Sequence, residues 1–226
     1  FSRRFMSTCS LPLLESHLQV VFKRKTSFVG SKALAFGLKF ISLSVKNEEM
    51  MNTLKPYVEN LLYETIVPIM LLSHKDVTLY RDDPIEYIRK SYDFTESIFA
   101  TKNQAIDLLE YLCSYRSGGK KKKKVTPPDY LNPFLHFCVQ NLDQYKTEAN
   151  PDFRIKEAIL LAIGSLESQI YSSKPLKQQM ENMLKAHAFD ELINNGPNAC
   201  FLNLRACWLY GEFGYLKFAD GEHIHQ

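Results

Sequence analysis

The stretch LKPYVENLLYETIVPIMLL, residues 54–72, decides the fold of this chain. Its apolar positions recur three and four residues apart, which is the period of one face of an α-helix. The positions in register are Leu54, Val58, Leu61, Leu62, Thr65, Ile66 and Ile69. Because a helix with such a stripe is stable only when the stripe is buried, we predict that this helix packs on further helices.

The front half of this stretch has a second copy downstream. Residues 54–62 and 176–184 share the pattern Leu-Lys-x-x-apolar-Glu-Asn-apolar-Leu. A second echo joins residues 158–162 (AILLA) to residues 206–210 (ACWLY). Internal similarity of this kind indicates helical repeats that stack on one another.

The helical period covers most of the chain. It predicts helices over residues 11–25, 31–45, 53–72, 84–94, 101–115, 127–145, 151–171, 176–193 and 200–217. No segment alternates with period two for long enough to predict a strand. The predicted fold class is therefore all-α.

Capping residues and prolines mark the helix ends. Ser31 is the expected N-cap of the second helix, and Asp83 followed by Pro84 is the expected start of a short one. Pro56 is expected in the first turn of a helix that begins at residue 52 or 53, where its missing N–H costs little. Pro68 lies late in that helix and is expected to kink it.

The predicted helices pair into four hairpins. They span residues 11–45, 53–115, 127–171 and 176–217. The first helices of neighbouring hairpins start roughly 42 or 49 residues apart in the two regular cases, which fits HEAT or armadillo repeats. We therefore predict an α-solenoid of HEAT-like hairpins, one segment of a right-handed superhelix over residues 1–226. The polar break expected at 74–83 lies in an insertion within the second hairpin.

Residues 116–126, RSGGKKKKKVT, form the clearest linker. Glycines and a run of like charges can neither bury surface nor tolerate their own repulsion in a helix, so we predict a disordered basic loop. Its lysines are candidates for contact with an anionic partner: Lys120, Lys121, Lys122, Lys123 and Lys124. The simpler interpretation is a solvated loop.

An acidic cluster precedes and opens the short helix. Asp82, Asp83 and Glu86 are candidates for contact with a basic partner, because opposite charges steer encounter. Helix capping and compensation of the helix dipole explain the same residues without a partner. Arg89, the fourth candidate, lies three residues after Glu86 and is equally placed for a local ion pair.

Composition excludes several classes of function. A formal net charge of +3 argues against a dedicated nucleic-acid binder. No apolar run reaches the length of a membrane span. Because no GxSxG, GxGxxG, P-loop or HExxH motif occurs, we predict no catalytic residue and no cofactor. His223 and His225 lack the spacing of metal ligands, and five scattered cysteines indicate reduced thiols.

Four stretches resemble the importin-β superfamily, or karyopherins, and most of all its branch with importin seven and importin eight. They are KPYVENLLYETIVPIM at 55–70, YRDDPIEYIRKSYDF at 80–94, IKEAILLAIGSL at 155–166 and LRACWLYGEF at 204–213. The most specific marker is the run from Asp83 to Arg89, DPIEYIR. The resemblance spans nearly the whole chain in order.

The resemblance implies a nuclear transport receptor of stacked HEAT repeats, of which this chain is a central piece. The implied partners are basic cargo such as ribosomal proteins or histones, the GTPase Ran through repeats outside this chain, and nucleoporin Phe-Gly repeats. It implies shuttling between cytoplasm and nucleus through the pore, without membrane or specific nucleic-acid binding. The lysine run departs from the acidic loops usual in the family. A helical-repeat scaffold or regulatory subunit unrelated to Ran remains the alternative.

Overall fold

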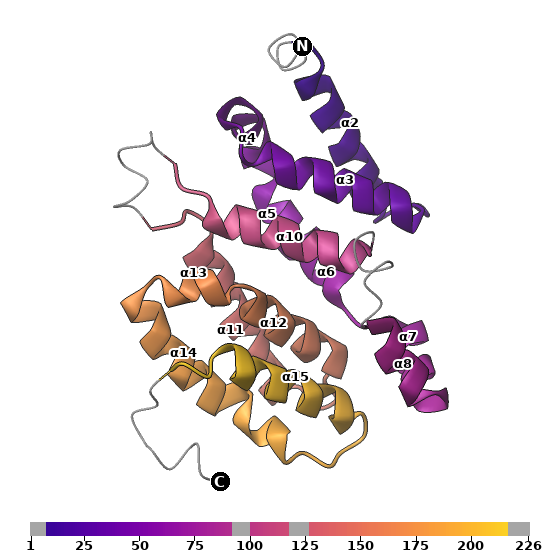
Figure 1. The fold of residues 1–226 in the computed structure, drawn as a ribbon, viewed down its shortest axis with the longest axis vertical. Helices are drawn as coiled ribbons and strands as arrows, with labels where there is room; N and C mark the ends of the chain where they lie inside the picture. The colour runs from indigo at the N-terminus through magenta and orange to yellow at the C-terminus, as the bar shows by residue number, and fades with distance from the viewer. Residues whose placement is uncertain (1–7, 92–99, 118–126, 217–226) are drawn as a thin grey trace. The chain divides into compact units, whose positions relative to one another are not determined.

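The computed structural model describes residues 8–91, 100–117 and 127–216. Within these ranges the chain is helical throughout and has no β-strand, which confirms the all-α prediction. No helix in the described ranges is both long and apolar enough to cross a bilayer. The chain divides into two units, Phe1–Leu131 and Asn132–Gln226 (Figure 1).

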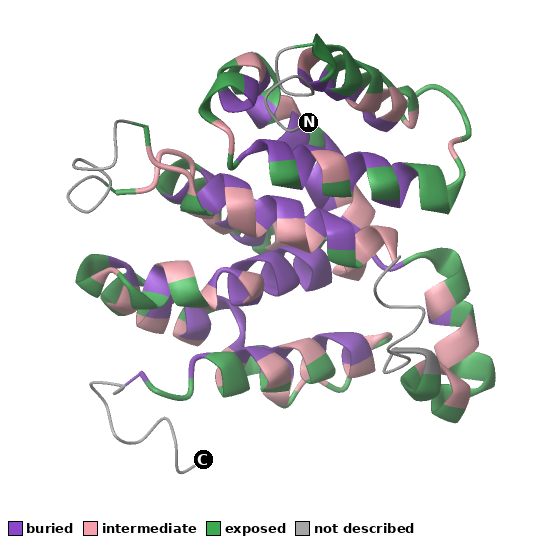
Figure 2. Cartoon of the chain, turned by 45° about the horizontal axis from the view of Figure 1, so that its top comes forward, coloured by how far each residue is buried: buried purple, intermediate pink, exposed green. Residues whose placement is uncertain are grey.

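The first unit is built from helices that bury one stripe each. They are α2 (Ser10–Lys23), α3 (Ser31–Ser44), α4 (Glu48–Leu54), η1 (Lys55–Tyr57), α5 (Val58–Leu61), η2 (Leu62–Ile66), α6 (Val67–Met70), α7 (His74–Asp82), α8 (Pro84–Ser91) and α10 (Thr101–Ser114). Leu38 and Ile41 of α3 and Leu108 and Leu112 of α10 are fully buried. Figure 2 shows buried and exposed residues alternating around the helices, as amphipathic stripes require.

The organising helix runs from Glu48 to Met70 and begins earlier than expected. Asn47 caps it, because the Asn47 side chain accepts a hydrogen bond from the Met50 backbone N–H at 3.0 Å. Pro56 lies in the 3-10 turn η1 rather than in the first turn of the helix. Sequence periodicity predicted the long stripe, but the cap at Asn47, seven residues before Leu54, sets the true start of the helix.

Pro68 is preceded by a widened π turn, η2. In this turn the Val67 N–H donates to the Leu62 carbonyl, five residues back instead of four. A proline ring inside a helix crowds the carbonyl four residues before it, and a π turn is one way to relieve that crowding. The expected disturbance at Pro68 therefore takes the form of a local change of helix type.

Helices α3 and α10 lie side by side and point the same way (Figure 1). Near their starts, the Thr101 hydroxyl donates to the Ser31 carbonyl at 3.1 Å. Near their ends, the Lys46 ammonium lies 4.4 Å from the centroid of the Tyr111 ring. Contacts that advance together along both helices show that the two are parallel.

The end of α2 meets the later part of the organising helix. The Phe22 and Tyr57 ring centroids are 5.9 Å apart, and Arg24 donates to the Pro68 carbonyl at 3.4 Å. The Lys25 ammonium donates to the Asn60 side chain at 3.2 Å. These contacts tie the end of α2 to residues 57–68 of the organising helix.

Two local predictions in this unit were wrong. Gly30, not Ser31, is the N-cap of α3, and Ser31 is its first residue. The polar break expected at 74–83 is the helix α7. A polar helix gives no apolar stripe, so periodicity missed it; the Ser73-x-x-Asp76 capping box marked its start in the sequence.

The second unit follows the same pattern. Its helices are α11 (Leu131–Thr147, which starts at the boundary residue), α12 (Phe153–Ser165), α13 (Glu167–Tyr171), α14 (Lys174–His187), η3 (Phe189–Leu192) and α15 (Ala199–Glu212). Helix α12 packs along α15 (Figure 1). Arg205 donates to the Glu157 carboxylate at 2.6 and 2.9 Å, and further along both helices Gly164 lies under the Trp208 ring. Helices α12 and α15 are therefore parallel as well.

Trp208 packs at an interface between helices. A Cβ atom on Gly164 would lie 2.3 Å from Trp208 Cζ3 and 3.0 Å from Leu209 Cδ1. The absence of a side chain at Gly164 thus lets the indole approach the α12 backbone. The Arg205 guanidinium covers the indole from another side, 4.8 Å from the ring centroid.

Gly164→Ala should lower the free energy of unfolding by about 1–3 kcal/mol, because the added methyl forces the indole or the helix to move. Urea unfolding followed by the fluorescence of Trp208, the only tryptophan of the chain, measures the loss. Gly211→Ala is the matched control on α15, since a Cβ there meets no atom within 4 Å. Equal losses in the two variants would contradict the packing argument.

Ion pairs join α12 to two neighbouring segments of the second unit. Lys156 on α12 pairs with Glu191 on η3, and both side chains are nearly inaccessible to water. Glu157, the next residue on α12, pairs with Arg205 on α15. Asn194 donates to the second Glu191 oxygen at 2.7 Å. Adjacent residues of one helix therefore bind two different neighbouring segments.

His187 is buried on α14, and its environment lowers its pKa. Burial is the main cause, Lys146 and Lys156 add to it, and Asp143 of α11, 3.4 Å from Nε2, opposes it. Below its unfolded-state pKa of about 6.5 the unfolded chain binds more protons than the folded chain. The contribution of the neutral His187 to the free energy of unfolding is therefore fully present above that pH and is lost as the pH is lowered.

The free energy of unfolding should therefore fall more steeply between pH 7 and 5 in the wild-type chain than in His187→Leu, which cannot bind the proton. Denaturation at a series of pH values, followed by Trp208 fluorescence, gives the two slopes. Equal slopes would show that protonation of His187 is not coupled to unfolding.

Candidate functional site

The predicted acidic site residues lie on a helical hairpin formed by α7 and α8, whose helices contact each other. Asp83 alone separates the two helices. At the start of α7, the Ser73 hydroxyl accepts from the Asp76 N–H at 3.1 Å and Asp76 accepts from the Ser73 N–H at 2.9 Å. The Tyr80 and Tyr87 rings meet edge to face, with centroids 5.4 Å apart. Local capping and one aromatic contact thus hold the hairpin together.

Asp83 caps α8, as its sequence context predicted. Its Oδ1 accepts from the Glu86 backbone N–H at 2.9 Å, and Pro84 takes the first helical position. A carboxylate here also faces the positive end of the helix dipole. The cap uses one carboxylate oxygen, and the side chain is exposed at the surface.

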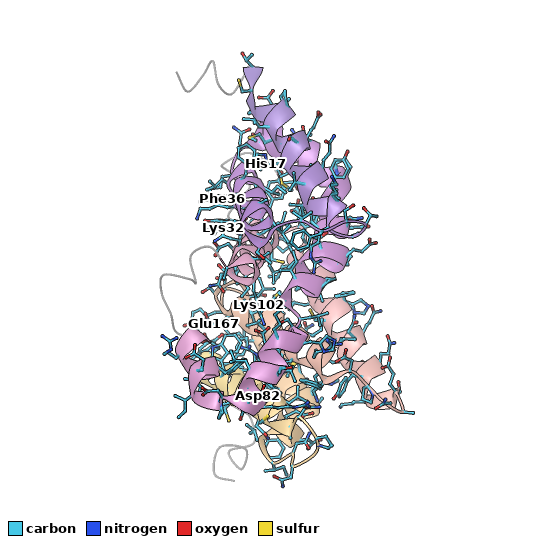
Figure 3. All side chains as sticks on the ribbon, turned by 90° about the vertical axis from the view of Figure 1, so that its right-hand side faces the viewer. His17, Lys32, Phe36, Asp82, Lys102 and Glu167 are labelled. Atoms are coloured by element: carbon cyan, nitrogen blue, oxygen red, sulfur yellow. The ribbon has the colours of Figure 1, made fainter. Side chains whose placement is uncertain are left out.

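Glu86 and Arg89 form a local ion pair. Arg89 Nε lies 2.6 Å from Glu86 Oε2, and Nη2 lies 2.8 Å from Oε1. This two-point geometry satisfies both charges within one turn of α8. Asp82 and Asp83 are exposed carboxylates at the junction of α7 and α8, next to Arg81 (Asp82 is labelled in Figure 3).

An apolar face accompanies the acidic edge, and sequence reasoning missed it. Ile85 is 78% exposed and Ile88 is 51% exposed, three residues apart on α8. On α7, by contrast, Val77 is buried. The signal was present in the sequence, because a helix of eight residues between polar segments has few neighbours on which to bury two isoleucines.

Acidic and apolar groups on one short hairpin can bind a segment that carries both positive charge and apolar side chains. The five predicted lysines, 120–124, lie outside the described residues. Within the described ranges no group of three or more His, Cys, Asp or Glu side chains has the arrangement of a metal site. The chemistry that this surface offers is recognition of a partner by charge and apolar contact.

All-helical units with an exposed, charged and apolar hairpin are typical of helical interaction proteins. A family model described as Cse1 matches residues 12–191. The chain thus belongs to the Cse1 family of the importin-β superfamily, which confirms the predicted relationship. This is a superfamily of non-enzymatic transport receptors, so the prediction that the chain is not an enzyme is confirmed too.

Three curated relatives illustrate the similarity. An importin beta-like SAD2 homolog of Arabidopsis thaliana is 29% identical over 97% of this chain and 20% of its own length. Human importin-8 is 29% identical over 96% of this chain and 19% of its own length. The importin alpha re-exporter of Saccharomyces cerevisiae is 25% identical over 83% and 20%. The chain spans about a fifth of the length of these relatives, and no solved structure matches it.

Proposed function

We propose that this chain is a segment of a nuclear transport receptor that binds protein cargo and carries it through nuclear pores under the control of Ran-GTP. The observation that carries the proposal is the family match over residues 12–191. Relatives named importin, similar along almost the entire chain, support it. The receptor would shuttle between cytoplasm and nucleus, with Ran bound mainly by repeats outside this chain and nucleoporin Phe-Gly repeats as further partners.

We infer that the helices form HEAT-like hairpins of an α-solenoid, with hairpins near 11–45, 53–115, 127–171 and 176–217. In a stack of helical hairpins, each helix lies parallel to the equivalent helix of the next repeat. Within the first unit α3 is parallel to α10. Within the second, α12 is parallel to α15. Two parallel pairs of this kind support stacked repeats.

The α7–α8 hairpin is the proposed cargo contact of this chain. Asp82 and Asp83 would attract basic cargo, while Ile85 and Ile88 would give apolar contact area. Exposed charges mainly raise the rate of encounter and fix orientation, and apolar side chains that become buried slow dissociation. Glu86 and Arg89 would contribute less, because they already pair with each other. The lysines at 120–124 would contact acidic partners.

Pull-down with the receptor that contains this chain tests the function. Immobilised receptor should retain histones or ribosomal proteins and release them on addition of Ran-GTP, while Ran-GDP leaves them bound. Retention of cargo that Ran-GTP does not affect would favour a helical scaffold unrelated to Ran. Failure to retain any basic protein would overturn the proposal.

Charge-neutral variants test the hairpin. The double variant Asp82→Asn, Asp83→Asn removes two charges and keeps the α8 cap, since asparagine caps helices as well as aspartate. It should slow association with basic cargo, most strongly at low salt. Glu48→Gln, Glu49→Gln is the matched control, because it removes two exposed charges from the first turn of α4. Equal effects of the two double variants would exclude a specific contact.

A further inference from the structure

Two tyrosine rings in the second unit enclose a lysine side chain. Tyr171 ends α13 and Tyr215 follows α15; their ring centroids are 4.7 Å apart and the rings are perpendicular, at 87°. The Lys177 ammonium, from the start of α14, lies 3.7 Å from the Tyr171 centroid and 5.9 Å from the Tyr215 centroid. Three separate segments thus place two aromatic walls around one positive charge.

A carboxylate and a buried ring hold one wall in place. Glu167 (labelled in Figure 3) opens α13, and its carboxylate accepts a hydrogen bond from the Tyr215 phenol. Burial and this carboxylate raise the pKa of Tyr215, so the phenol remains neutral. The ring of Phe213, which is fully buried, lies 6.2 Å from the Tyr215 ring. The wall is therefore preorganised, and a negative charge stands beside it.

The two rings remain open to water. Tyr171 is 52% exposed and Tyr215 is 37% exposed, so neither serves chiefly as core packing. The face of an aromatic ring attracts cations, and the attraction increases when the cation is partly shielded from water. Aromatic rings grouped around one point bind cationic ligands in this way, and a neighbouring carboxylate adds attraction of opposite charge.

We propose that Tyr171, Tyr215 and Glu167 form a binding site for an arginine side chain of a basic partner segment, and that Lys177 occupies this site when the partner is absent. The choice of partner rests on the proposed function, in which the cargo is basic. The guanidinium lies flat on Tyr171 and points an N–H group toward Glu167.

Arginine can displace Lys177 for two physical reasons. A guanidinium is planar and less strongly hydrated than an ammonium, so it stacks on an aromatic ring at a lower desolvation cost. Lys177 is attached by a flexible stem and is only partly buried, so its ammonium can return to water. Release of Lys177 offsets part of the binding energy, which makes the site selective for segments with arginine.

Peptide titration of this chain tests the site. The probe is an acetylated, amidated Gly-Arg-Gly-Arg-Gly peptide, and its partner peptide replaces arginine by citrulline, which has nearly the same shape without the charge. The arginine peptide should shift the ring NMR signals of Tyr171 and Tyr215 saturably, and the citrulline peptide should not. Equal shifts with both peptides, or no saturable shift with either, would overturn the proposal.

Four variants locate the binding. Lys177→Met keeps the apolar stem, removes the competing charge and should tighten binding about threefold or more; Tyr171→Leu should weaken it by a similar factor. Tyr111→Leu is the matched control, because it removes the ring from the single-ring Lys46–Tyr111 pair of the first unit. Tyr215→Phe retains the ring and the fold, loses the Glu167 hydrogen bond and should weaken binding less than Tyr171→Leu. Weaker binding by Lys177→Met, or equal effects of Tyr171→Leu and Tyr111→Leu, would overturn the proposal.

The outcome of the peptide titration does not depend on the transport assay, since the titration needs neither Ran nor cargo. Arginine-specific binding at this site supports the inference even if the receptor fails to retain cargo in the pull-down, a failure that would overturn only the proposed function. Cargo retention with no peptide binding to wild type or Lys177→Met would overturn only this inference.

Discussion

Lys156→Met should lower the free energy of unfolding by about 3–5 kcal/mol, the usual cost of removing one partner from a buried ion pair. The variant leaves the Glu191 carboxylate buried with Asn194 as its hydrogen-bond donor and no neighbouring positive charge from Lys156. Methionine matches the length of the lysine stem, so the loss comes from charge rather than from a cavity. Urea unfolding followed by Trp208 fluorescence measures it in the unit that contains the pair.

The double variant Lys156→Met, Glu191→Gln provides the control. Removal of both charges should restore most of the lost stability, because a neutral amide is far cheaper to bury than a carboxylate. Glutamine also still accepts a hydrogen bond from Asn194. A double variant as unstable as Lys156→Met would contradict the argument and would show that the lysine stem itself is essential to the packing.

Leu61→Ala should cost about 2–5 kcal/mol, as for other large-to-small changes in a well-packed core. Leu61 is fully buried in α5, at the centre of the stripe that organises the first unit. The π turn follows it immediately, so the backbone on that side is already fixed by the Leu62–Val67 hydrogen bond and has little freedom to collapse into the cavity. The loss should therefore lie toward the upper end of the range.

Leu43→Ala is the matched control for this prediction. It removes the same atoms from α3, where the Leu43 side chain is 53% exposed, and should change stability by no more than about 0.5 kcal/mol. Chemical unfolding followed by far-UV circular dichroism compares the two variants. Similar losses at the two positions would mean that the stripe of residues 54–72 is not the core of this unit.

The sequence predicted those features of the fold that depend on local patterns. The period of apolar residues predicted the helices and the all-α class, and the Asp83-Pro84 pair correctly placed the start of α8. Periodicity failed where a helix has no apolar stripe, as in α7. It also failed where helix type changes, since a proline predicts a disturbance but not whether the chain responds with a kink or a wider turn.

The sequence could not predict which distant side chains meet. The echo of residues 158–162 in residues 206–210 indicated equivalent helices, and Glu157 and Arg205 stand at the same separation, 48 residues. The echo did not indicate that the equivalent positions of α12 and α15 touch. Local patterns predict the contact between Tyr171 and Tyr215 even less, because it depends on how α13 and the end of α15 pack. The candidate acidic residues were visible because they are contiguous in the chain.

The π turn before Pro68 has a consequence for the phase of the helix. A residue in an α-helix rotates the chain by about 100°, so the extra residue in η2 turns everything beyond it by that angle relative to an uninterrupted helix. Val67 and Met70 are buried in this rotated setting. Loss of one residue from 62–66 would turn the Val67–Leu62 hydrogen bond into an ordinary α-helical one and leave Val67 and Met70 facing the core. The wider turn therefore absorbs one extra residue without changing which face of the later helix is buried.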